Sequence, residues 1–367
     1  MKDLRIKLGD YSYSFSIGSG CSLAIAERLL ALDADRFFFI ADDAVAEFAS
    51  KLAARVERKA PVVMLPFSPS EAIKVLATVE RIINEMLDGG ATRASCIVAV
   101  GGGITGNVAG LCAALLYRGV RLVHVPTTLM AAADSVLSLK QGVNTRHGKN
   151  LVGTYYAPAM VLVDTEPLST LPLRERRAGL CEMIKNALAI EPRIIDLLTE
   201  KLDGRCELDA SSLEWVVETS IATKARVTDL DPFEKRAALV LEYGHTVGHA
   251  IERASQGRVV HGEAVGLGMI VAADISSRFG WLSREEAALH RTLVARIGAP
   301  TVLFGGATAD GVVAAVAADN KRGYRSVRPD ESLMILLRGL GEPNVCDGVP
   351  LTAVPHDLLG SALSAIA

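Results

Sequence analysis

The sequence predicts an α/β protein in two parts: a doubly wound, Rossmann-like domain over residues 1–165 and a mostly helical domain over residues 166–367. Two observations support this prediction. In the first part, nearly continuous apolar runs alternate with helical periods, which is the pattern of a parallel sheet covered by helices on both faces. In the second part helical periods dominate, and a strong strand pattern returns only at residues 333–337.

The individual elements follow from these periods. The apolar runs predict strands at residues 36–42, 61–66, 96–100, 122–125 and 160–164. A helical period over residues 71–87 is one of those that separate these strands. In the second part, the periods predict helices at residues 174–190, 212–227, 244–254 and 263–279.

Composition narrows the class of protein. The 367 residues, 50% of them hydrophobic, are enough for two domains and a sizeable core. A net charge of −3 gives no reason to expect nucleic acid or a membrane surface as partner. No secretory signal follows Met1, and no apolar run approaches the ~20 residues of a membrane-spanning helix. The six cysteines are scattered without a C-x-x-C pair, which is typical of a reducing cytoplasm.

A glycine-rich turn follows the predicted strand at residues 96–100. Residues 101–106 read G-G-G-I-T-G, and such a turn places backbone N–H groups at a helix N-terminus, where they favour a dinucleotide pyrophosphate. The pattern is a variant of the usual fingerprint, and a tight turn alone would also need these glycines. Asp42 ends an earlier strand, where it either binds a ribose hydroxyl or caps a turn. Thr127 and Thr128 either contact the nucleotide or cap a helix.

Three of the seven histidines fall within residues 245–261, with carboxylates on either side. His245 and His249 share one face of a predicted helix, and His261 begins the next element. Imidazoles and carboxylates are the usual ligands of a catalytic divalent metal that keeps one position open. The spacing does not decide which two histidines bind the metal. It also leaves four candidate carboxylates: Glu182, Glu242, Glu252 and Glu263.

Several lysines interrupt apolar or glycine-rich stretches. Lys140 and Lys149 belong to a glycine-rich loop predicted over residues 134–153, and Lys185 lies in an apolar helix. A buried lysine is unfavourable unless an anion pairs with it, although each could instead extend to solvent. The recurrence of such lysines favours a small, polyhydroxylated substrate that carries a phosphate.

Eight motifs in the same order indicate a family. They are residues 101–110, 118–119 and 125–128, the pair Asp134 and Lys140, and residues 148–150, 182–185, 244–249 and 261–263. With these motifs the chain resembles the sugar phosphate cyclases, whose best known member is 3-dehydroquinate synthase. The resemblance runs from residues 11–20 to residues 319–324, nearly the whole chain. It implies a cytoplasmic enzyme that uses NAD and a divalent metal, zinc or cobalt, and assembles as a homodimer.

The resemblance also implies roles for individual residues. The metal ligands would be Glu182, His245 and His261. NAD would be held by Asp42, Glu71, Lys74, Gly102, Gly103, Thr105, Gly106, Asn107, Thr127, Thr128 and Lys149. Contacts to the substrate ring and its phosphate would come from Asp134, Lys140, Asn150, Lys185, Lys224, His249 and Lys321, with Arg118 reaching the site either of its own chain or of a dimer mate. Lys140 and His249 would act in catalysis, and we hypothesise that Glu242 does so as well.

Departures from the dehydroquinate synthase pattern refine this expectation. Glu242 stands where those enzymes have Asn, and Ala238 replaces an Arg that pairs with the substrate carboxylate. Asn107 replaces an Asp, and residues 135–141 read S-V-L-S-L-K-Q in place of a serine- and glycine-rich run. Losing that Arg favours a substrate without a carboxylate, because an unpaired buried anion would cost several kcal/mol.

With these substitutions and the sequences of residues 241–245 and 320–324, the chain resembles one branch of the sugar phosphate cyclases. Enzymes of that branch cyclise glucose 6-phosphate to 2-deoxy-scyllo-inosose in aminocyclitol antibiotic biosynthesis. This resemblance implies oxidation at C4 by NAD, with the metal on the C4 hydroxyl, removal of the C5 proton by Glu242, loss of phosphate, re-reduction and an intramolecular aldol reaction. Three alternatives remain: a dehydroquinate synthase or other cyclase, a metal-dependent polyol dehydrogenase, and a non-enzymatic NAD-sensing or scaffold protein.

Overall fold

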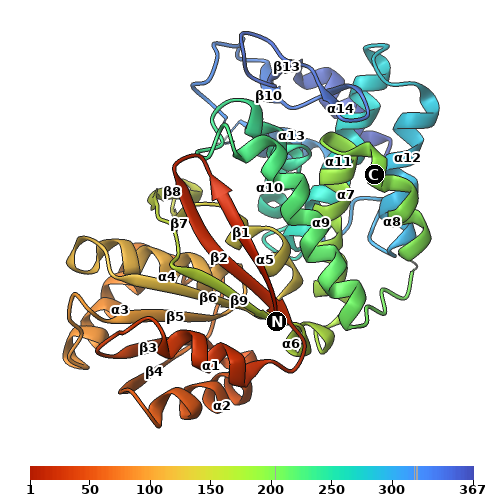
Figure 1. The fold of residues 1–367 in the computed structure, drawn as a ribbon. Helices are drawn as coiled ribbons and strands as arrows, with labels where there is room; N and C mark the ends of the chain where they lie inside the picture. The colour runs from red at the N-terminus through yellow and green to blue at the C-terminus, as the bar shows by residue number, and fades with distance from the viewer. Residues whose placement is uncertain (203, 318, 320) are drawn as a thin grey trace. The chain divides into compact units, whose positions relative to one another are not determined.

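The computed structural model of the protein describes residues 1–202, 204–317, 319 and 321–367 (Figure 1). Asn320, which begins the 320–324 motif, lies outside the described residues. The chain divides into two compact units. Unit 1 comprises Met1–Leu171 and Leu208–Ile221, and unit 2 comprises Pro172–Glu207 and Ala222–Ala367. A single boundary at residues 165/166 was predicted from the sequence, whereas this division is discontinuous: the segment Leu208–Ile221 belongs to unit 1.

A seven-stranded sheet forms the centre of unit 1 (Figure 1). Its strands lie in the order β1-β2-β9-β6-β5-β3-β4, and every neighbouring pair is parallel except the antiparallel pair β1 and β2. The bounds are β1 Lys2–Leu8, β2 Tyr11–Gly18, β3 Phe37–Asp42, β4 Val62–Phe67, β5 Cys96–Gly101, β6 Arg121–Pro126 and β9 Met160–Asp164. All five strands predicted from apolar runs are therefore confirmed.

Helices cover both faces of this sheet, and its central strands β3 and β5 are buried at every position. In β3, Phe38 and Ile40 pack in a core cluster with α3 and α4, whereas Phe37 and Phe39 pack in another with α1 and α2. This confirms the doubly wound arrangement. The helices of unit 1 are α1 Ser22–Leu30, α2 Ala46–Glu57, α3 Leu76–Asp88, α4 Gly103–Leu115, α5 Leu129–Ala133 and α6 Thr165–Ser169. The 3₁₀ turns are η1 Asp43–Val45, η2 Leu116–Arg118 and η3 Ser135–Leu137.

Two local predictions in unit 1 were wrong. The helix expected from residue 71 begins at Leu76, because Val75 is extended and forms a β-bridge with Asn144. The expected loop over residues 134–153 contains an antiparallel hairpin of β7 Lys140–Thr145 and β8 Gly148–Tyr155. A Cβ on Gly153 would lie 2.0 Å from the carbonyl oxygen of Gln141, so this glycine permits the close pairing of the two strands.

Unit 2 is mostly helical, as predicted. Its helices are α7 Leu173–Ala189, α8 Ile195–Lys201, α10 His245–Ala254, α11 His261–Arg278, α12 Arg284–Arg296, α13 Ala309–Val316 and α14 His356–Ser364, while α9 Ala210–Thr228 crosses the division between the units. The 3₁₀ turns are η4 Pro192–Ile194 and η5 Ala237–Glu242. Two small antiparallel pairs join β10 Glu331–Met334 to β13 Thr352–Pro355 and β11 Leu337–Gly339 to β12 Glu342–Pro343.

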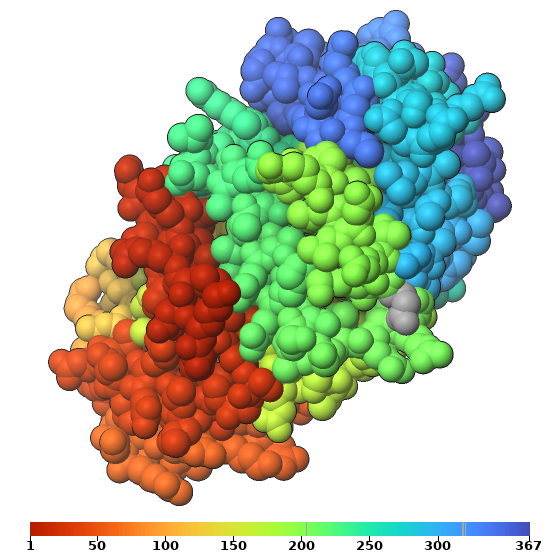
Figure 2. Space-filling view, turned by 45° about the vertical axis from the view of Figure 1, so that its right-hand side comes forward, coloured from red at the N-terminus to blue at the C-terminus, as the bar shows by residue number. Residues whose placement is uncertain are grey.

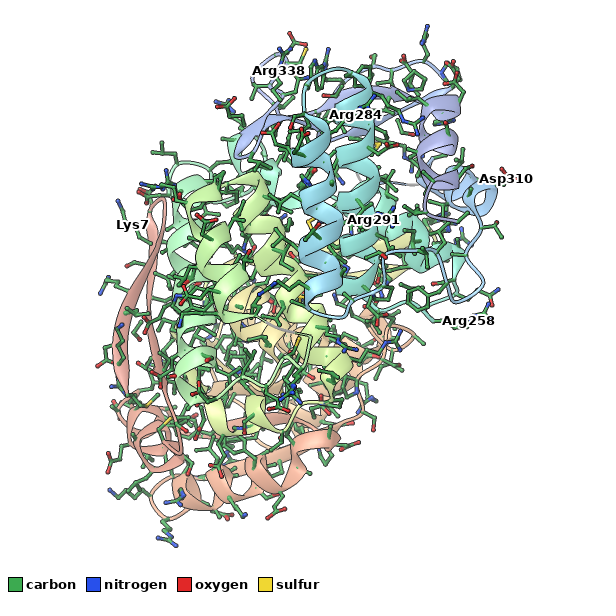
Figure 3. The ribbon with its side chains drawn as sticks, turned by 90° about the vertical axis from the view of Figure 1, so that its right-hand side faces the viewer. Lys7, Arg258, Arg284, Arg291, Asp310 and Arg338 are labelled. Atoms are coloured by element: carbon green, nitrogen blue, oxygen red, sulfur yellow. The ribbon has the colours of Figure 1, made fainter. Side chains whose placement is uncertain are left out.

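The surface carries the polar residues that the amphipathic pattern predicts. β1 is an edge strand with alternating exposed and buried side chains, and the N-terminal hairpin is exposed in the space-filling view (red in Figure 2). Lys7 on β1 and Arg284 on α12 both project outward (Figure 3). Within the part of the chain that is described, none of the helices combines the length and apolar character that a bilayer crossing needs.

Glycines allow α10 and α11 to approach each other closely, and this contact predicts the effect of a single methyl group. A Cβ on Gly268 of α11 would lie 2.0 Å from the carbonyl oxygen of Gly244, which precedes α10 with a φ of 78°. We expect Gly268→Ala to lower the free energy of unfolding by about 1–3 kcal/mol, because a helix backbone must move. Thermal unfolding of the purified protein measures this change.

Gly360→Ala is the matched control, because Gly360 also lies inside a helix but a Cβ there would meet only Val313, at 3.9 Å. This variant should be unchanged or more stable by up to about 1 kcal/mol. If Gly268→Ala unfolds at or above the wild-type temperature, the close contact does not constrain these helices.

Candidate active site

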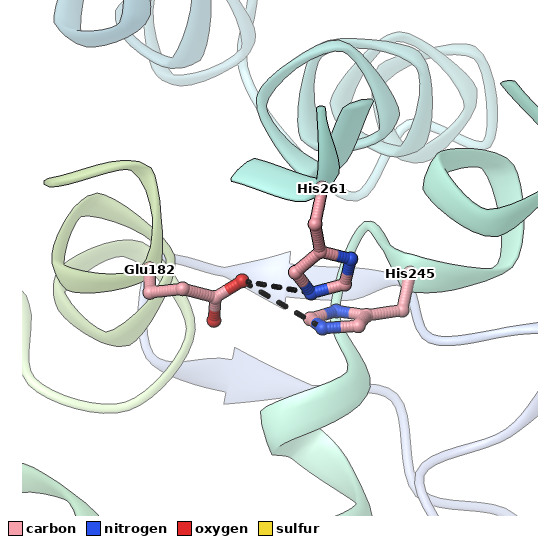
Figure 4. A group of neighbouring side chains, drawn as sticks. All are labelled: Glu182, His245 and His261. Atoms are coloured by element: carbon pink, nitrogen blue, oxygen red, sulfur yellow. Dashed lines mark ion pairs between the residues drawn. The ribbon is translucent and has the colours of Figure 1, made fainter. Parts of the chain in front are cut away.

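Three side chains from three helices of unit 2 converge on one point (Figure 4). Glu182 comes from the middle of α7, His245 from the first position of α10 and His261 from the first position of α11. The Oε1 atom of Glu182 lies 3.7 Å from Nε2 of His245 and 3.6 Å from Nε2 of His261. The three potential ligand atoms all lie within 4.8 Å of one another, which is close enough to share one ion.

The condition of Glu182 tests whether these residues fit a metal. Its side chain is 1% exposed, and its Oε2 accepts a hydrogen bond from Lys185 Nζ at 2.5 Å. Its Oε1 is buried, and none of the described residues donates a hydrogen bond to it. A buried carboxylate oxygen that accepts no hydrogen bond destabilises the fold unless a bound group, such as a cation, offsets its charge. Two imidazole nitrogens and one carboxylate oxygen match a catalytic zinc or cobalt site that keeps a position open, so the residues fit the ion.

Hydrogen bonds on the far side of each imidazole orient both rings. Nδ1 of His245 lies 3.2 Å from the carbonyl oxygen of Tyr243, and Nδ1 of His261 lies 3.2 Å from Oε2 of Glu252. Burial holds the pKa of His245 well below its usual value, although the charge of Glu242 opposes this shift. His245 is therefore neutral, as metal ligation requires.

Glycines next to both histidines bring their helices close together. A Cβ on Gly262 would lie 2.2 Å from the carbonyl oxygen of Ala178 in α7, and Gly244 makes the contact with α11 described above. Glu263, one of the four candidate carboxylates, accepts hydrogen bonds from Arg174 at 2.7 and 2.9 Å and from the backbone N–H of Val260. This places Glu263 at the start of α11 as a capping residue.

A second cluster in unit 2 surrounds a buried lysine. Lys321 is 2% exposed, and its Nζ lies 3.4 Å from Oε2 of Glu242 and 3.3 Å from Oδ1 of Asp319. Nδ1 of His249 lies 3.8 Å from Oδ2 of Asp319. Burial would raise the pKa of Asp319, but Lys321 and His249 outweigh it, so the net shift is downward. The structure thus brings Glu242, His249 and Lys321 together through Asp319, a residue that the sequence analysis did not single out.

The glycine turn of unit 1 joins β5 to α4. A Cβ on Gly101 would lie 2.7 Å from Oγ1 of Thr105, so only glycine fits there. Asn107 donates to the carbonyl oxygen of Gly103 and accepts from the backbone N–H of Gly142, which ties the turn to β7. Asp42 and Thr128 were each predicted either to contact the nucleotide or to cap a turn or helix, and the structure contains both capping hydrogen bonds. Asp42 accepts from the N–H of Ala44, and Thr128 accepts from the N–H of Ala131.

A network beside the hairpin joins four of the predicted residues. Lys74, which is 5% exposed, donates to Oδ1 of Asn150 at 2.6 Å, and Lys149 lies 3.6 Å from Glu71. Asn144 links these pairs: its Nδ2 donates to Oε2 of Glu71 at 2.6 Å, and its Oδ1 accepts from the N–H of Asn150 at 3.0 Å. Asn144 was not among the residues predicted from the sequence. The sequence feature that could have indicated it is its position as an asparagine within the glycine-rich segment 134–153, which was expected to bind a ligand.

The remaining predicted residues are placed as follows. Asp134 follows α5 and Lys140 begins β7, both half-buried, and Lys224 is buried on α9. Thr127 is buried and donates its N–H to the carbonyl oxygen of Gly101. Arg118 is exposed on a turn in which Tyr117, Arg118 and Gly119 all have positive φ, at 51°, 66° and 131°. Such backbone strain at non-glycine residues tends to accompany functional sites.

Comparison with known proteins identifies what the chain is similar to. Residues 64–178 match the family model of the 3-dehydroquinate synthase N-terminal part, and residues 179–322 match that of its C-terminal part. A 2-deoxy-scyllo-inosose synthase of Streptoalloteichus tenebrarius is 47% identical over 100% of this chain and 96% of its own length. These matches confirm the resemblance inferred from the motifs.

Two solved structures agree with this result. A crystal structure of a 2-deoxy-scyllo-inosose synthase complexed with carbaglucose-6-phosphate, NAD⁺ and Co²⁺ has a TM-score of 0.94 and 37% identity, with all of both chains covered. A 2-epi-5-epi-valiolone synthase from Streptomyces hygroscopicus with NAD⁺ and Zn²⁺ bound has a TM-score of 0.84 and 27% identity over 98% of both chains.

The ion pair of Glu182 and Lys185 predicts a non-additive effect on stability. We expect Lys185→Met to lower the free energy of unfolding of the metal-free protein by about 3–5 kcal/mol, because it leaves the Glu182 carboxylate buried without a counter-charge. The double variant Lys185→Met/Glu182→Gln should be less destabilised than the single one. Thermal unfolding with a chelator present measures both. A double variant that is as unstable as Lys185→Met would contradict this account.

Proposed function

The chain belongs to the 3-dehydroquinate synthase family, and we propose that it cyclises D-glucose 6-phosphate to 2-deoxy-scyllo-inosose with loss of phosphate. Such an enzyme is a carbon–oxygen lyase, and its product serves aminoglycoside antibiotic biosynthesis. The reaction runs through transient oxidation at C4, elimination of phosphate, re-reduction of C4 and an intramolecular aldol addition.

Two observations together carry this proposal beyond the family: Glu242 lies 3.4 Å from the buried Lys321, and Ala238 is fully buried. The first places a carboxylate beside a lysine suited to a phosphate ester. The second puts a methyl group at the position where the resemblance expects a carboxylate-pairing arginine, and the nearby Arg236 is exposed. Glucose 6-phosphate carries a phosphate and no carboxylate, so it suits both features.

Two bound groups would complete the chemistry. Glu182, His245 and His261 would hold a divalent ion, zinc or cobalt, which lowers the pKa of a hydroxyl that it coordinates. The residues of unit 1 around the glycine turn would hold NAD, with Glu71 and Lys74 at a ribose. Bound NAD supplies a hydride acceptor that returns the hydride later, so the overall reaction involves no net redox change.

The protein's own residues account for the proton and the leaving group. Once C4 is a ketone, the C5–H bond is acidic, and Glu242 takes this proton as general base. The C6–O bond then breaks, and phosphate leaves with the bonding electron pair toward Lys321 and His249. After C4 is reduced and the ring opens, C6 forms a bond to the C1 aldehyde carbon. Lys140, Asp134, Asn150, Lys185 and Lys224 orient the hydroxyl groups throughout.

We also propose a cytoplasmic homodimer. Five of the six cysteines are buried as free thiols, which suits a reducing compartment. Arg118 is exposed on its strained turn, from where it would complete the site either of its own chain or of the dimer mate.

Product analysis tests this function against its alternatives. The protein with NAD and Co²⁺ should release inorganic phosphate from glucose 6-phosphate, accumulate no NADH and form a six-carbon carbocyclic ketone identified by NMR and mass spectrometry. Phosphate release only from the carboxylate-bearing substrate of dehydroquinate synthases would contradict the glucose assignment. Steady accumulation of NADH without phosphate release would instead indicate a polyol dehydrogenase.

Replacing the proposed base separates binding from elimination. We expect Glu242→Gln to bind NAD and glucose 6-phosphate with affinities close to those of the wild type, but to release phosphate about 10²–10⁴-fold more slowly, because the amide cannot accept the C5 proton. Calorimetry measures binding, and a phosphate assay measures release. Glu285→Gln, on the exposed start of α12, is the control and should behave as wild type. Undiminished turnover in Glu242→Gln would remove this residue from the role of base.

A further inference from the structure

His261 belongs to two groups of potential metal ligands. One is the Glu182, His245 and His261 group of Figure 4, and the other consists of His249, Glu252 and His261. The rings of His249 and His261 are stacked with centroids 5.8 Å apart, so His249 also lies next to the shared ligand. Proximity alone does not decide which group takes the ion.

The hydrogen bond of His261 distinguishes the two groups. Its Nδ1 lies 3.2 Å from Oε2 of Glu252, and its Nε2 lies 3.6 Å from Oε1 of Glu182. An ionised carboxylate only accepts hydrogen bonds, so Nδ1 carries the proton that it donates to Glu252. A neutral imidazole has one N–H and one lone pair, and the lone pair is therefore on Nε2, which faces Glu182.

Glu252 is built into the fold for this contact. Its side chain is 5% exposed, and it lies on α10 two turns after His245. One helix therefore provides both a ligand and the partner that orients another ligand. The two outer partners differ in charge: His245 donates to the neutral carbonyl of Tyr243, whereas His261 donates to a carboxylate. A carboxylate partner raises the basicity of the ring and strengthens metal binding.

We propose that Glu252 is a positioning residue that holds His261 in the Nδ1-protonated form and thereby directs the ion to the Glu182 group. In this role Glu252 orients a ligand and does not itself bind the ion. The inference rests on the proposed function in one respect, namely that the protein binds a divalent metal.

Metal affinity tests the inference with a readout that does not depend on turnover. Co²⁺ is titrated into the metal-free protein in competition with a chromophoric chelator, and the visible absorption of bound Co²⁺ is recorded. Glu252→Gln keeps an oxygen acceptor for Nδ1 but removes the charge, and we expect affinity about 10-fold lower with a similar Co²⁺ spectrum. Glu252→Ala removes both the acceptor and the charge, and we expect the affinity for Co²⁺ to fall by up to about 100-fold, with an altered Co²⁺ spectrum. Glu285→Gln should bind as wild type.

The outcomes separate this inference from the proposed function. If the wild type binds Co²⁺ and the Glu252 variants bind it equally tightly, the positioning role of Glu252 is overturned, whereas the metal centre stands. If Glu182→Gln keeps the wild-type affinity for Co²⁺ and Glu252→Ala loses that affinity, the ion binds to the His249, Glu252 and His261 group. This result would overturn the assignment of the ion to the Glu182 group. A wild-type protein with no affinity for Co²⁺ or Zn²⁺ would refute the metal centre itself. Thermal unfolding of each metal-free variant confirms that it is folded, and Glu252→Gln remains informative if Glu252→Ala is not.

Discussion

A buried carboxylate with a hydrogen-bond donor on only one of its two oxygens, as far as the described residues go, is the constraint on which the candidate centre depends. One oxygen of Glu182 accepts from Lys185, and the other has no donor from the described residues. Such an atom is unfavourable in a dry interior unless something bound offsets it. The two imidazole nitrogens that face it specify a cation that accepts both nitrogen and oxygen ligands, as zinc and cobalt do.

Precision at this centre comes from the backbone as much as from the ligands. Each histidine ligand adjoins a glycine that permits a very close helix contact, Gly244 against α11 and Gly262 against α7. The helices therefore have little freedom to slide, since packed interiors tolerate few voids or overlaps. Orientation of the rings is a separate matter, which the hydrogen bonds from their Nδ1 atoms settle. A catalytic geometry needs both kinds of restraint.

Much of the fold could be predicted because apolar periodicity is local. The strand Phe37–Asp42 is buried at every position, so its pattern is visible without its neighbours. The hairpin Lys140–Tyr155 was missed because its residues are polar or glycine and carry no such pattern. The histidine cluster was recognisable for the same local reason, whereas the carboxylate could not be chosen by spacing, since Glu182 lies far from His245 in the sequence. Asn144 and Asp319 act through contacts between distant segments, which no single-chain pattern reveals.

The network around Asn144 has a consequence for how this region can vary. Its side chain joins the segment containing Glu71 to the hairpin, and its backbone N–H donates to the carbonyl of Lys74. An insertion or deletion between β7 and β8 would shift β8 relative to Asn144 and would disturb the contacts of Asn150 with Asn144 and Lys74. Surface hairpins usually tolerate changes in length. This one should not, and loop grafting between related enzymes would therefore have to exchange the Glu71–Val75 segment and the hairpin as a single module.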